Sequence, residues 1–450
     1  MCAITGVFNV DHAAEIAYHM AYHLQHRAQD SAGGVSVDNG EFFVRKGFGL
    51  LRDALPKRVA IKLPGRSSVF HLRYRTAGEL TMSNIQPLLT ETRYGNVAVS
   101  LNGNFPLALE KRASLIREGN IFATTADTEV ALHYIINSGA PTLLEAVGKG
   151  LIACPGAYSL LFLTKDQLIA VRDPCGYRPL FIGRYQNGWI FASETCALVN
   201  VGASETRSLA PGEAVIVDRK GCISRQLFPQ KKRGCFCIFE KIYIQRPDSQ
   251  LDGIDVSRIR FDLGRALARE HPVKADCVVP ILDSGLWAAI GFAAESRMLF
   301  LPGLIRNHYV DRTFIEPDQV TRNHTVHLKH SVSENWARGK RIALVDDSIV
   351  RGTTLPNLVR LFRQAGAKEV HCRISCPPIV SPCFFGVNIS SKEELLAASL
   401  DLEEMRQRVG ADSLQFLSLG KMNKVCGDSK GMRHCTSCFT GTYHTEVPKF

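Results

Sequence analysis

The first half of the chain, up to about residue 228, alternates short apolar runs with turns rich in Gly and Asp. Runs of this length are typical of strands that are buried on at least one face. Two stretches, near 12–26 and 128–138, have helical spacing instead. The pattern predicts stacked antiparallel sheets with helices on their outer faces. The clearest strand candidates are VAVSLNG (97–103), AYSLLFL (157–163), LIAVRDP (168–174) and WIFAS (189–193).

The second half alternates strands with helices, as a parallel sheet requires. Between the halves, around PQKKRGCFC (229–237), the composition turns basic and the apolar pattern pauses. We therefore expect one domain over 2–228 and another over 229–450, with a last helical region at about 391–409. The predicted elements are strands at 275–282, 341–347 and 369–375 and helices at 285–296 and from Leu355 to a cap at Gly366.

The composition is that of a globular protein, with 450 residues, 45% hydrophobic and 22% charged. No apolar run approaches the roughly 18 residues that a membrane span requires. The N-terminal segment, interrupted by Asp11, His12 and Glu15, does not have the pattern of a secretory signal. We therefore expect a cytoplasmic protein without membrane contact.

The formal net charge of +11 favours anionic ligands. Nucleic-acid binders concentrate their basic residues on one face, whereas here they are dispersed apart from 229–234 and the C-terminal tail. Phosphorylated small molecules are therefore the expected ligands, and nucleic acid is not.

Two features stand out among the fourteen cysteines, most of which we expect to be small buried hydrophobic residues. The spacing CTSC (435–438) could direct two thiols to one metal, but a metal site needs two more ligands. Cys2 follows Met1, whose removal would put a thiol and an α-amine on one residue. Their usual pKa values, about 8.5 and 7.7–8.0, would let each serve the other at neutral pH. Alternatively, Cys2 merely begins a buried strand.

The best-formed site signal is ALVDDSIVRGTT (343–354), where an apolar strand ends in two carboxylates and a hydroxyl-rich loop enters a helix. Ligands of parallel sheets bind at this end of the strands, and the N–H groups of such a loop can hold a phosphate. Asp346 and Asp347 suit ribose hydroxyls or magnesium. Together these groups describe a phosphoribosyl ligand. Neither GxGxxG nor GxxxxGK[ST] is present, which argues against dinucleotide or ATP binding.

This stretch resembles the phosphoribosyl-pyrophosphate (PRPP) motif of type I phosphoribosyltransferases. Nearly the whole chain resembles the amidophosphoribosyltransferase family, which implies an N-terminal-nucleophile hydrolase sandwich (αββα) followed by an α/β phosphoribosyltransferase domain with a parallel sheet. The matching motifs are HRAQDSAG (26–33), RYRTAG (73–78), NGN (102–104), DTEV (127–130), RDPCGYRPL (172–180), FEKIYIQRPDS (239–249), GLIRNHYVDRTFI (303–315) and VDDSIVRGTT (345–354).

The resemblance implies a glutaminase site in the first half. Cys2 would be the nucleophile, with its own α-amine as the proton acceptor. Asn102 and the N–H of Gly103 would form the oxyanion hole. Arg73 would bind the α-carboxylate of glutamine, and Asp127 its α-ammonium.

The resemblance also implies that ammonia passes inside the protein to a second site. There it would attack C1 of PRPP, displace pyrophosphate and give 5-phosphoribosylamine, the first step of de novo purine synthesis. Asp346 and Asp347 would contact the ribose hydroxyls and magnesium, and Ser284 matches a position on the metal and pyrophosphate side. Arg312 and Lys329 would contact pyrophosphate from a loop that closes over the site. The 5′-phosphate would lie on Ser348, Ile349, Val350, Arg351, Gly352, Thr353 and Thr354.

One branch of the family carries a 4Fe-4S cluster on four thiolates, and the matching positions are Cys237, Cys383, Cys435 and Cys438. Zinc is the less favoured occupant. We expect a structural cluster, since the reaction needs no electron. The family is commonly inhibited by purine nucleotides and forms homodimers or homotetramers.

The chain departs from the family near both sites: Leu101 replaces a His, Pro106 follows the NGN motif, and Asp311 replaces a Gly in the mobile loop. Two other classes of function therefore stay open. One is a PRPP-dependent paralogue that uses another acceptor, and the other is a non-catalytic regulator that senses nucleotides. The retained Cys2 and its partner residues favour the enzyme.

Overall fold

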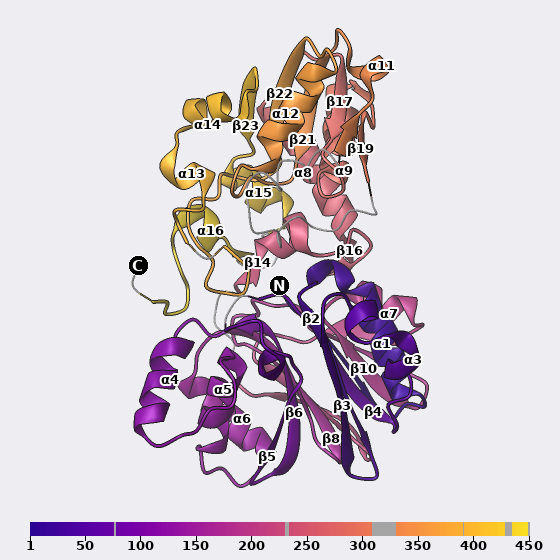
Figure 1. Ribbon diagram of the computed structural model, residues 1–450, viewed down its shortest axis with the longest axis vertical. Helices are drawn as coiled ribbons and strands as arrows, with labels where there is room; N and C mark the ends of the chain where they lie inside the picture. The colour runs from indigo at the N-terminus through magenta and orange to yellow at the C-terminus, as the bar shows by residue number, and fades with distance from the viewer. Residues whose placement is uncertain (76–77, 230–233, 308–329, 390, 428–433, 449–450) are drawn as a thin grey trace.

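The computed structural model describes residues 1–450 except 76–77, 230–233, 308–329, 390, 428–433 and 449–450. The first half of the chain forms the lower part of the molecule in Figure 1 and the second half the upper part. The N-terminus lies where the two parts meet. No helix within the described ranges has both the length and the apolar character needed to cross a bilayer.

The first half is a sandwich of two antiparallel sheets. The seven-stranded sheet has the order β11-β9-β10-β1-β4-β2-β3 and the six-stranded sheet the order β13-β12-β8-β7-β6-β5. The strands of the first sheet are β1 (Ala3–Phe8), β2 (Ser31–Asp38), β3 (Glu41–Phe48), β4 (Ser67–Arg73), β9 (Phe181–Tyr185), β10 (Gly188–Ala192) and β11 (Ser204–Ser208). Those of the second are β5 (Leu88–Thr92), β6 (Gly95–Asn104), β7 (Ala157–Leu163), β8 (Gln167–Arg172), β12 (Glu213–Asp218) and β13 (Gly221–Gln226).

Helices cover both outer faces of the sandwich (Figure 1). The two sheets bury a common core between them, in which Ile4 and Val69 of one sheet meet Leu161 and Ala170 of the other. The predicted αββα arrangement is therefore confirmed. The helices over the first sheet are α1 (Ala13–His23), α2 (Leu51–Ala54), α3 (Lys57–Ala60) and α7 (Thr195–Asn200), with η1 (Gln25–Arg27) after α1; those over the second are α4 (Ala108–Arg117), α5 (Asp127–Ile136) and α6 (Leu143–Ala153), and η2 (Met82–Asn84) precedes β5.

The second half is built on a five-stranded parallel sheet of order β18-β17-β21-β22-β23. This confirms the predicted α/β class of the second half. The strands are β17 (Cys277–Pro280), β18 (Leu299–Phe300), β21 (Arg341–Asp346), β22 (Glu369–Ile374) and β23 (Ser413–Phe416). The helices are α8 (Val256–Glu270), α9 (Leu286–Ser296), α11 (Glu334–Ala337), α12 (Thr354–Gln364), α14 (Leu402–Val409), α15 (Leu419–Val425) and α16 (Ser437–Thr440).

The predicted helical region at 391–409 is wrong in its extent. It contains two helices, α13 (Leu396–Ser399) and α14, separated by extended backbone at Leu400 and Asp401. The side chain of Asp401 accepts a hydrogen bond from the N–H of Glu404, and Glu404 reciprocates. This capping box starts a new helix at that point.

The second half also contains short elements near its start and its end. β14 (Phe236–Cys237) pairs in parallel with β24 (His434–Cys435), and the π-helical turn η3 (Glu240–Ile244) follows β14. Two small ribbons complete the upper half, β15 (Gln250–Leu251) with β16 (Ile254–Asp255) and β19 (Leu304–Arg306) with β20 (His330–Val332). The domain boundary between 228 and 229 remains a prediction.

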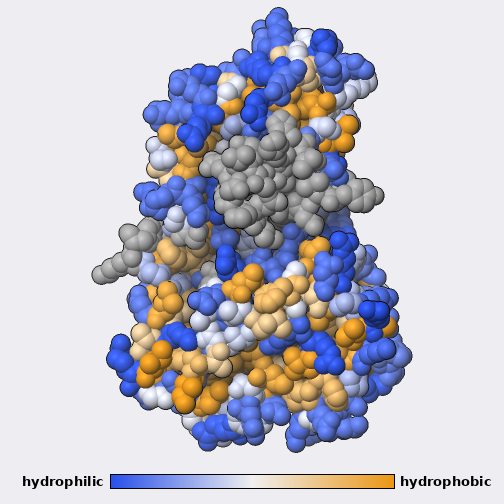
Figure 2. All heavy atoms as spheres, viewed as in Figure 1, coloured by the Kyte–Doolittle hydropathy of each residue, from blue (hydrophilic) through white to orange (hydrophobic). Residues whose placement is uncertain are grey.

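Figure 2 shows hydrophilic side chains over most of the upper half and a larger share of apolar ones over the lower half. Four apolar side chains on or next to α4 and α6 each expose more than half of their surface: Leu109, Ile116, Ile121 and Ile152.

Two candidate active sites

Cys2 lies immediately before β1, a strand in the middle of the seven-stranded sheet. The residue is buried, and its Sγ lies 3.6 Å from the carbonyl oxygen of Tyr74. It borders a small, partly open cavity of about 10 Å³. The cavity is lined by Cys2, Arg73, Tyr74, Gln86, Leu101, Gly103, Ala126 and Asp127. The structure therefore brings the predicted nucleophile together with three of its predicted partners.

The predicted oxyanion residues end β6. A Cβ atom at Gly103 would overlap the carbonyl oxygen of Ala157, so only glycine fits there. Asn102 has no exposed surface, and neither its amide nitrogen nor its amide oxygen has a hydrogen-bond partner among the described residues. A buried amide without a partner is costly. Asn102 is not among the residues that line the cavity, so its place in the oxyanion hole stays a prediction.

Opposite charges line the same cavity. Arg73, at the end of β4, donates from Nη1 to the carbonyl oxygen of Asn84 at 2.9 Å. Asp127 begins α5 and accepts hydrogen bonds from the N–H groups of Phe105 (3.1 Å) and Thr128 (2.9 Å). Burial raises the pKa of Asp127. A guanidinium and a carboxylate that line one cavity match the two charges of a free amino acid.

Burial also governs the acid–base chemistry of the first residues. It raises the pKa of the Cys2 thiol and lowers the pKa of the N-terminal amine to about 5. An amine with that pKa is neutral at pH 7. In the described chain the amine belongs to Met1, whose side chain packs into the hydrophobic core of the second half.

The backbone at Leu101 is fixed from two sides, although the side chain differs from the family pattern. Its N–H donates to Oε1 of Gln86 at 2.7 Å, and its carbonyl oxygen lies 3.0 Å from Nε2 of the buried His71. These contacts hold β6 just before the oxyanion residues.

Sequence reasoning missed a buried ion network behind Cys2. Nε of Arg27 donates to the carbonyl oxygen of Cys2 at 3.0 Å, and Nη1 donates to Glu194 at 2.6 Å. The same guanidinium contacts Glu240 of η3, which also pairs with Arg178 at 3.3 Å. The segments HRAQDSAG, RDPCGYRPL and FEKIYIQRPDS, which carry the family resemblance, contain Arg27, Arg178 and Glu240 and were the available signal.

The second candidate site lies at the carboxyl end of β21. Asp346 ends this strand, and α12 begins at Thr354, so the predicted loop lies between strand and helix. Asp346 accepts hydrogen bonds from the N–H of Asp347 at 2.8 Å and from Ser284. Burial and the neighbouring Asp347 raise the pKa of Asp346 well above its usual range. Ser284 comes from the loop after β17, the adjacent strand, so the three predicted oxygen ligands meet.

Contacts with the first residue of α13 and with the segment before it hold the loop between β21 and α12. The carbonyl oxygen of Val350 accepts a hydrogen bond from the N–H of Leu396 at 3.0 Å, and Arg351 pairs with Glu394 at 2.6 Å. Gly352 has φ +67, in the left-handed region that glycine favours. The eleven-residue helix α12 directs its N-terminal N–H groups at this loop, as in an anion site. Arg312 and Lys329 lie outside the described residues.

Comparison with known proteins places the chain in a family. A model of the glutamine amidotransferase domain matches residues 71–200. Amidophosphoribosyltransferase of Bacillus subtilis is 42% identical, over 99% of this chain and 94% of the relative. The chloroplastic amidophosphoribosyltransferase of Glycine max is 44% identical, over 99% of this chain and 78% of the relative.

The chain belongs to the amidophosphoribosyltransferase family.

Solved structures agree with this membership. The structure of glutamine PRPP amidotransferase from B. subtilis, complexed with ADP and GMP, is 41% identical with a TM-score of 0.93 and covers 100% of this chain and 98% of that one. A structure described as the allosteric regulatory enzyme of purine biosynthesis gives a TM-score of 0.94 at 41% identity, over 100% and 97% of the two chains.

The four predicted cluster cysteines of this family member gather at the junction of the halves. Cys237 and Cys435 face each other in the β14–β24 pair. Burial is the main cause that raises the pKa of the Cys438 thiol well above its usual range, and the charges of neighbouring thiols raise it further. Those neighbours are Cys383, Cys237, Cys435 and Cys376. In the described part of the chain, no three His, Cys, Asp or Glu side chains form a group that could hold a metal ion.

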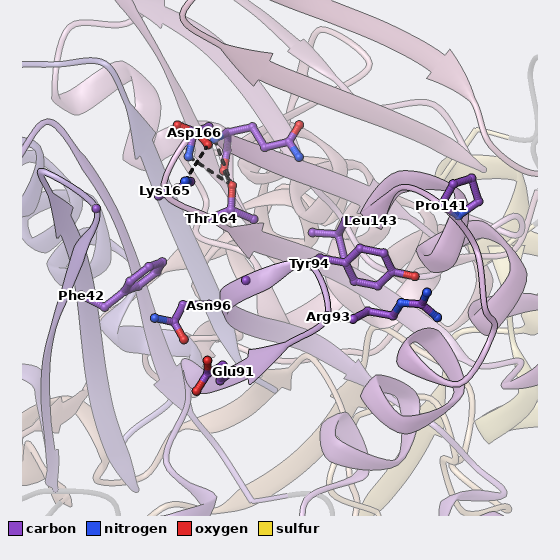
Figure 3. Close-up of a pocket in the computed structure, with 13 residues that line it drawn as sticks. Phe42, Glu91, Arg93, Tyr94, Asn96, Pro141, Leu143, Thr164, Lys165 and Asp166 are labelled. Carbon is purple, nitrogen blue, oxygen red and sulfur yellow. Dashed lines mark hydrogen bonds and ion pairs between the residues drawn. The ribbon is translucent and has the colours of Figure 1, made fainter.

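A further hollow, of about 600 Å³, lies away from both sites. Figure 3 shows Arg93 and Tyr94 on one side and Lys165 and Asp166 on another, from the turns that join β5 to β6 and β7 to β8. Asn96 lines this hollow near the start of β6, whereas Asn102 lies near the other end of the same strand. Six residues of extended strand span about 20 Å. The hollow therefore does not belong to the glutaminase site.

Proposed function

We propose that this amidophosphoribosyltransferase moves the amide nitrogen of glutamine to C1 of PRPP through two sites in one chain. The products are glutamate, pyrophosphate and 5-phosphoribosylamine, in the first step of de novo purine synthesis. The meeting of Cys2, Arg73, Gly103 and Asp127 at one buried cavity carries the proposal. Neither of the other classes considered, a paralogue with another acceptor or a regulator without turnover, needs that cavity.

In the first half-reaction, Cys2 Sγ attacks the side-chain amide carbon of glutamine, and its proton moves to the α-amine. This assignment includes the removal of Met1, which leaves the amine on Cys2 itself. The carbonyl oxygen becomes an oxyanion that the Asn102 amide and the Gly103 N–H stabilise. Ammonia leaves, a thioester remains, and water then releases glutamate.

In the second half-reaction, ammonia attacks C1 of PRPP while the bond from C1 to pyrophosphate breaks. Asp346 and Asp347 bind the ribose hydroxyls and, together with Ser284, supply the hard oxygen ligands that Mg²⁺ prefers. Bound magnesium would neutralise the charge that develops on the leaving pyrophosphate. The N–H groups of residues 348–354 hold the 5′-phosphate. We keep Arg312 and Lys329 as predicted pyrophosphate contacts.

The cysteine group fits a 4Fe-4S cluster in its chemistry. Four thiols lie near one another, Arg178 supplies a positive charge beside Cys237 and Cys383, and the N–H of Phe385 donates to Cys383 Sγ at 3.4 Å. We propose Cys237, Cys383, Cys435 and Cys438 as ligands of a structural cluster.

The remaining partners follow from the family. The B. subtilis relative was solved with ADP and GMP, and we propose that purine nucleotides inhibit this enzyme too. The exposed apolar residues on α4 and α6 support a homodimer or homotetramer. None of the fourteen cysteines, all of which lie in the described part of the chain, forms a disulfide, which supports a cytoplasmic location.

Coupled product formation tests the proposed function. Purified protein is incubated with glutamine, PRPP and magnesium, and glutamate and pyrophosphate are measured together. We expect equal amounts of the two, and no pyrophosphate when glutamine and ammonia are both omitted. Pyrophosphate without any nitrogen donor would show that PRPP is hydrolysed, which would contradict the proposal, and binding of PRPP without turnover would favour the regulator.

A further inference from the structure

The loop from Cys383 to Gly386 comes from the second half of the chain but lies against the glutaminase site. Gly386 has φ +105 and contacts the backbone of Gly103. A Cβ atom at Gly386 would lie 3.2 Å from both the carbonyl carbon and the carbonyl oxygen of Gly103, and 3.3 Å from its Cα. The absence of a side chain at position 386 therefore lets two backbones meet at the proposed oxyanion hole.

A second contact secures the same strand. Nδ2 of Asn104, the residue after Gly103, donates to the carbonyl oxygen of Phe384 at 2.9 Å. The ring of Phe385 stacks on the ring of Tyr177, with centroids 4.4 Å apart. The loop is thus held by a hydrogen bond and a ring stack in addition to the contact between the two glycines.

A third contact leads from the loop to the nucleophile. Arg178 donates from Nε to the carbonyl oxygen of Phe385 at 2.7 Å and pairs with Glu240. Glu240 in turn holds Arg27, whose Nε donates to the carbonyl oxygen of Cys2. The three charged side chains have no exposed surface. Buried charges fully paired in this way have little freedom to rearrange.

We propose, on the basis of the role assigned above to Gly103, that the Cys383–Gly386 loop is a positioning element of the glutaminase site. It fixes the oxyanion hole through Gly103 and Asn104, and it fixes the Cys2 backbone through Arg178, Glu240 and Arg27. A catalytic constellation has to be held within about 0.5 Å of its productive geometry. Displacement of the loop therefore slows the chemistry on glutamine, while the transfer of added ammonia to PRPP continues.

Gly386→Ala tests this role. The added methyl group pushes on the Gly103 backbone, so we expect the glutamine-dependent kcat to fall about tenfold or more. The KM for glutamine should change less than about threefold, because Arg73 and Asp127 are untouched. The ammonia-dependent rate should stay within about twofold of wild type. Asn104→Ser removes a hydrogen bond without adding atoms. It should also lower the glutamine-dependent kcat and leave the ammonia-dependent rate unchanged, but the loss should be smaller.

Gly410→Ala is the matched control. This glycine ends α14 with φ +76, and the nearest atom to an added Cβ would be Val359 Cγ1 at 4.0 Å. Alanine at position 410 is strained in the same way as alanine at position 386, but it does not push on Gly103. The glutamine-dependent and ammonia-dependent rates should therefore both be those of wild type. Thermal midpoints, with iron and sulfide contents, show whether each variant keeps its fold and its cysteine group.

The outcomes are distinct. An unchanged glutamine-dependent rate in both Gly386→Ala and Asn104→Ser overturns the proposal, as does an equal loss of the glutamine and ammonia activities. If Gly386→Ala does not fold, Asn104→Ser alone decides between these results. A wild-type glutamine rate in Asn102→Ala would instead contradict the glutaminase site itself, and with it the role of Gly103.

Discussion

Arg27 and Glu240, which lie 213 positions apart in the chain, form a buried two-pronged ion pair. Nη1 of the arginine lies 3.0 Å from Oε2 of the glutamate, and Nη2 lies 2.9 Å from Oε1. Neither side chain has any exposed surface. The pair joins the glutaminase half to η3 of the second half, directly behind the proposed nucleophile.

Glu240→Ala should destabilise the protein severely. The substitution leaves Arg27 and Arg178 buried without a shared partner, and breaking a buried pair in this way costs about 3–5 kcal/mol. Urea unfolding measures the loss. Glu403→Ala, which removes the partner of Arg406 on the surface of α14, should leave the unfolding curve almost unchanged. Similar curves for the two variants would show that the buried network does not hold the halves together.

Asn102→Ala should lower the glutamine-dependent kcat by about 10²–10³, the usual effect of removing one oxyanion donor. The ammonia-dependent rate should not change, because the second site is intact. Steady-state assays with each nitrogen donor measure both. Asn96→Ala, near the opposite end of β6 and beside the hollow of Figure 3, is the control and should behave as wild type. Equal losses with both donors would contradict the role of Asn102.

Asp347→Asn should weaken the binding of PRPP with magnesium about tenfold to a hundredfold. The reason is that a hydrogen bond or ligand contact to a charged group contributes about 1.5–3 kcal/mol. Titration calorimetry measures the dissociation constant. Asp276→Asn is the matched control, since Asp276 pairs with Arg341 at the amino end of β21, away from the site. A weaker complex in the control, or an unchanged one in Asp347→Asn, would contradict the assignment.

The buried His71 predicts a pH dependence of stability. Burial lowers its pKa from about 6.5 to about 3. Between these values the unfolded chain binds a proton that the folded chain does not, so the free energy of unfolding falls as the pH is lowered. The slope from this one group is about 1.4 kcal/mol per pH unit. Urea unfolding at pH 7 and pH 5 should show a smaller difference in His71→Asn than in wild type, and an equal difference would contradict the prediction.

Several elements could be predicted because their signal is local. The strands β6, β7, β8 and β10 appear as apolar runs, and the phosphate loop is contiguous with the end of β21. The candidate glutaminase residues came from ordered motifs, and Cys2, Arg73, Gly103 and Asp127 meet at one cavity.

Contacts between the two halves could not be predicted from the sequence. The spacing of apolar residues does not indicate which segments of the two domains meet. The contact between Gly386 and Gly103 therefore had no signal in the sequence. The Arg27–Glu240 pair also has no local signature, because any of many charged residues could have been buried. At 391–409, the spacing of apolar residues did not predict where the helices begin, because the cap formed by Asp401 starts a new helix there.

The most direct test compares wild type with Cys2→Ala, using pyrophosphate release from PRPP and magnesium with glutamine and, separately, with ammonia. We expect wild type to use both donors and Cys2→Ala to use ammonia alone at a rate close to that of wild type. Glutamine-dependent release by Cys2→Ala would contradict the assignment of Cys2 as the nucleophile, and no release by wild type with either donor would contradict the two-site account.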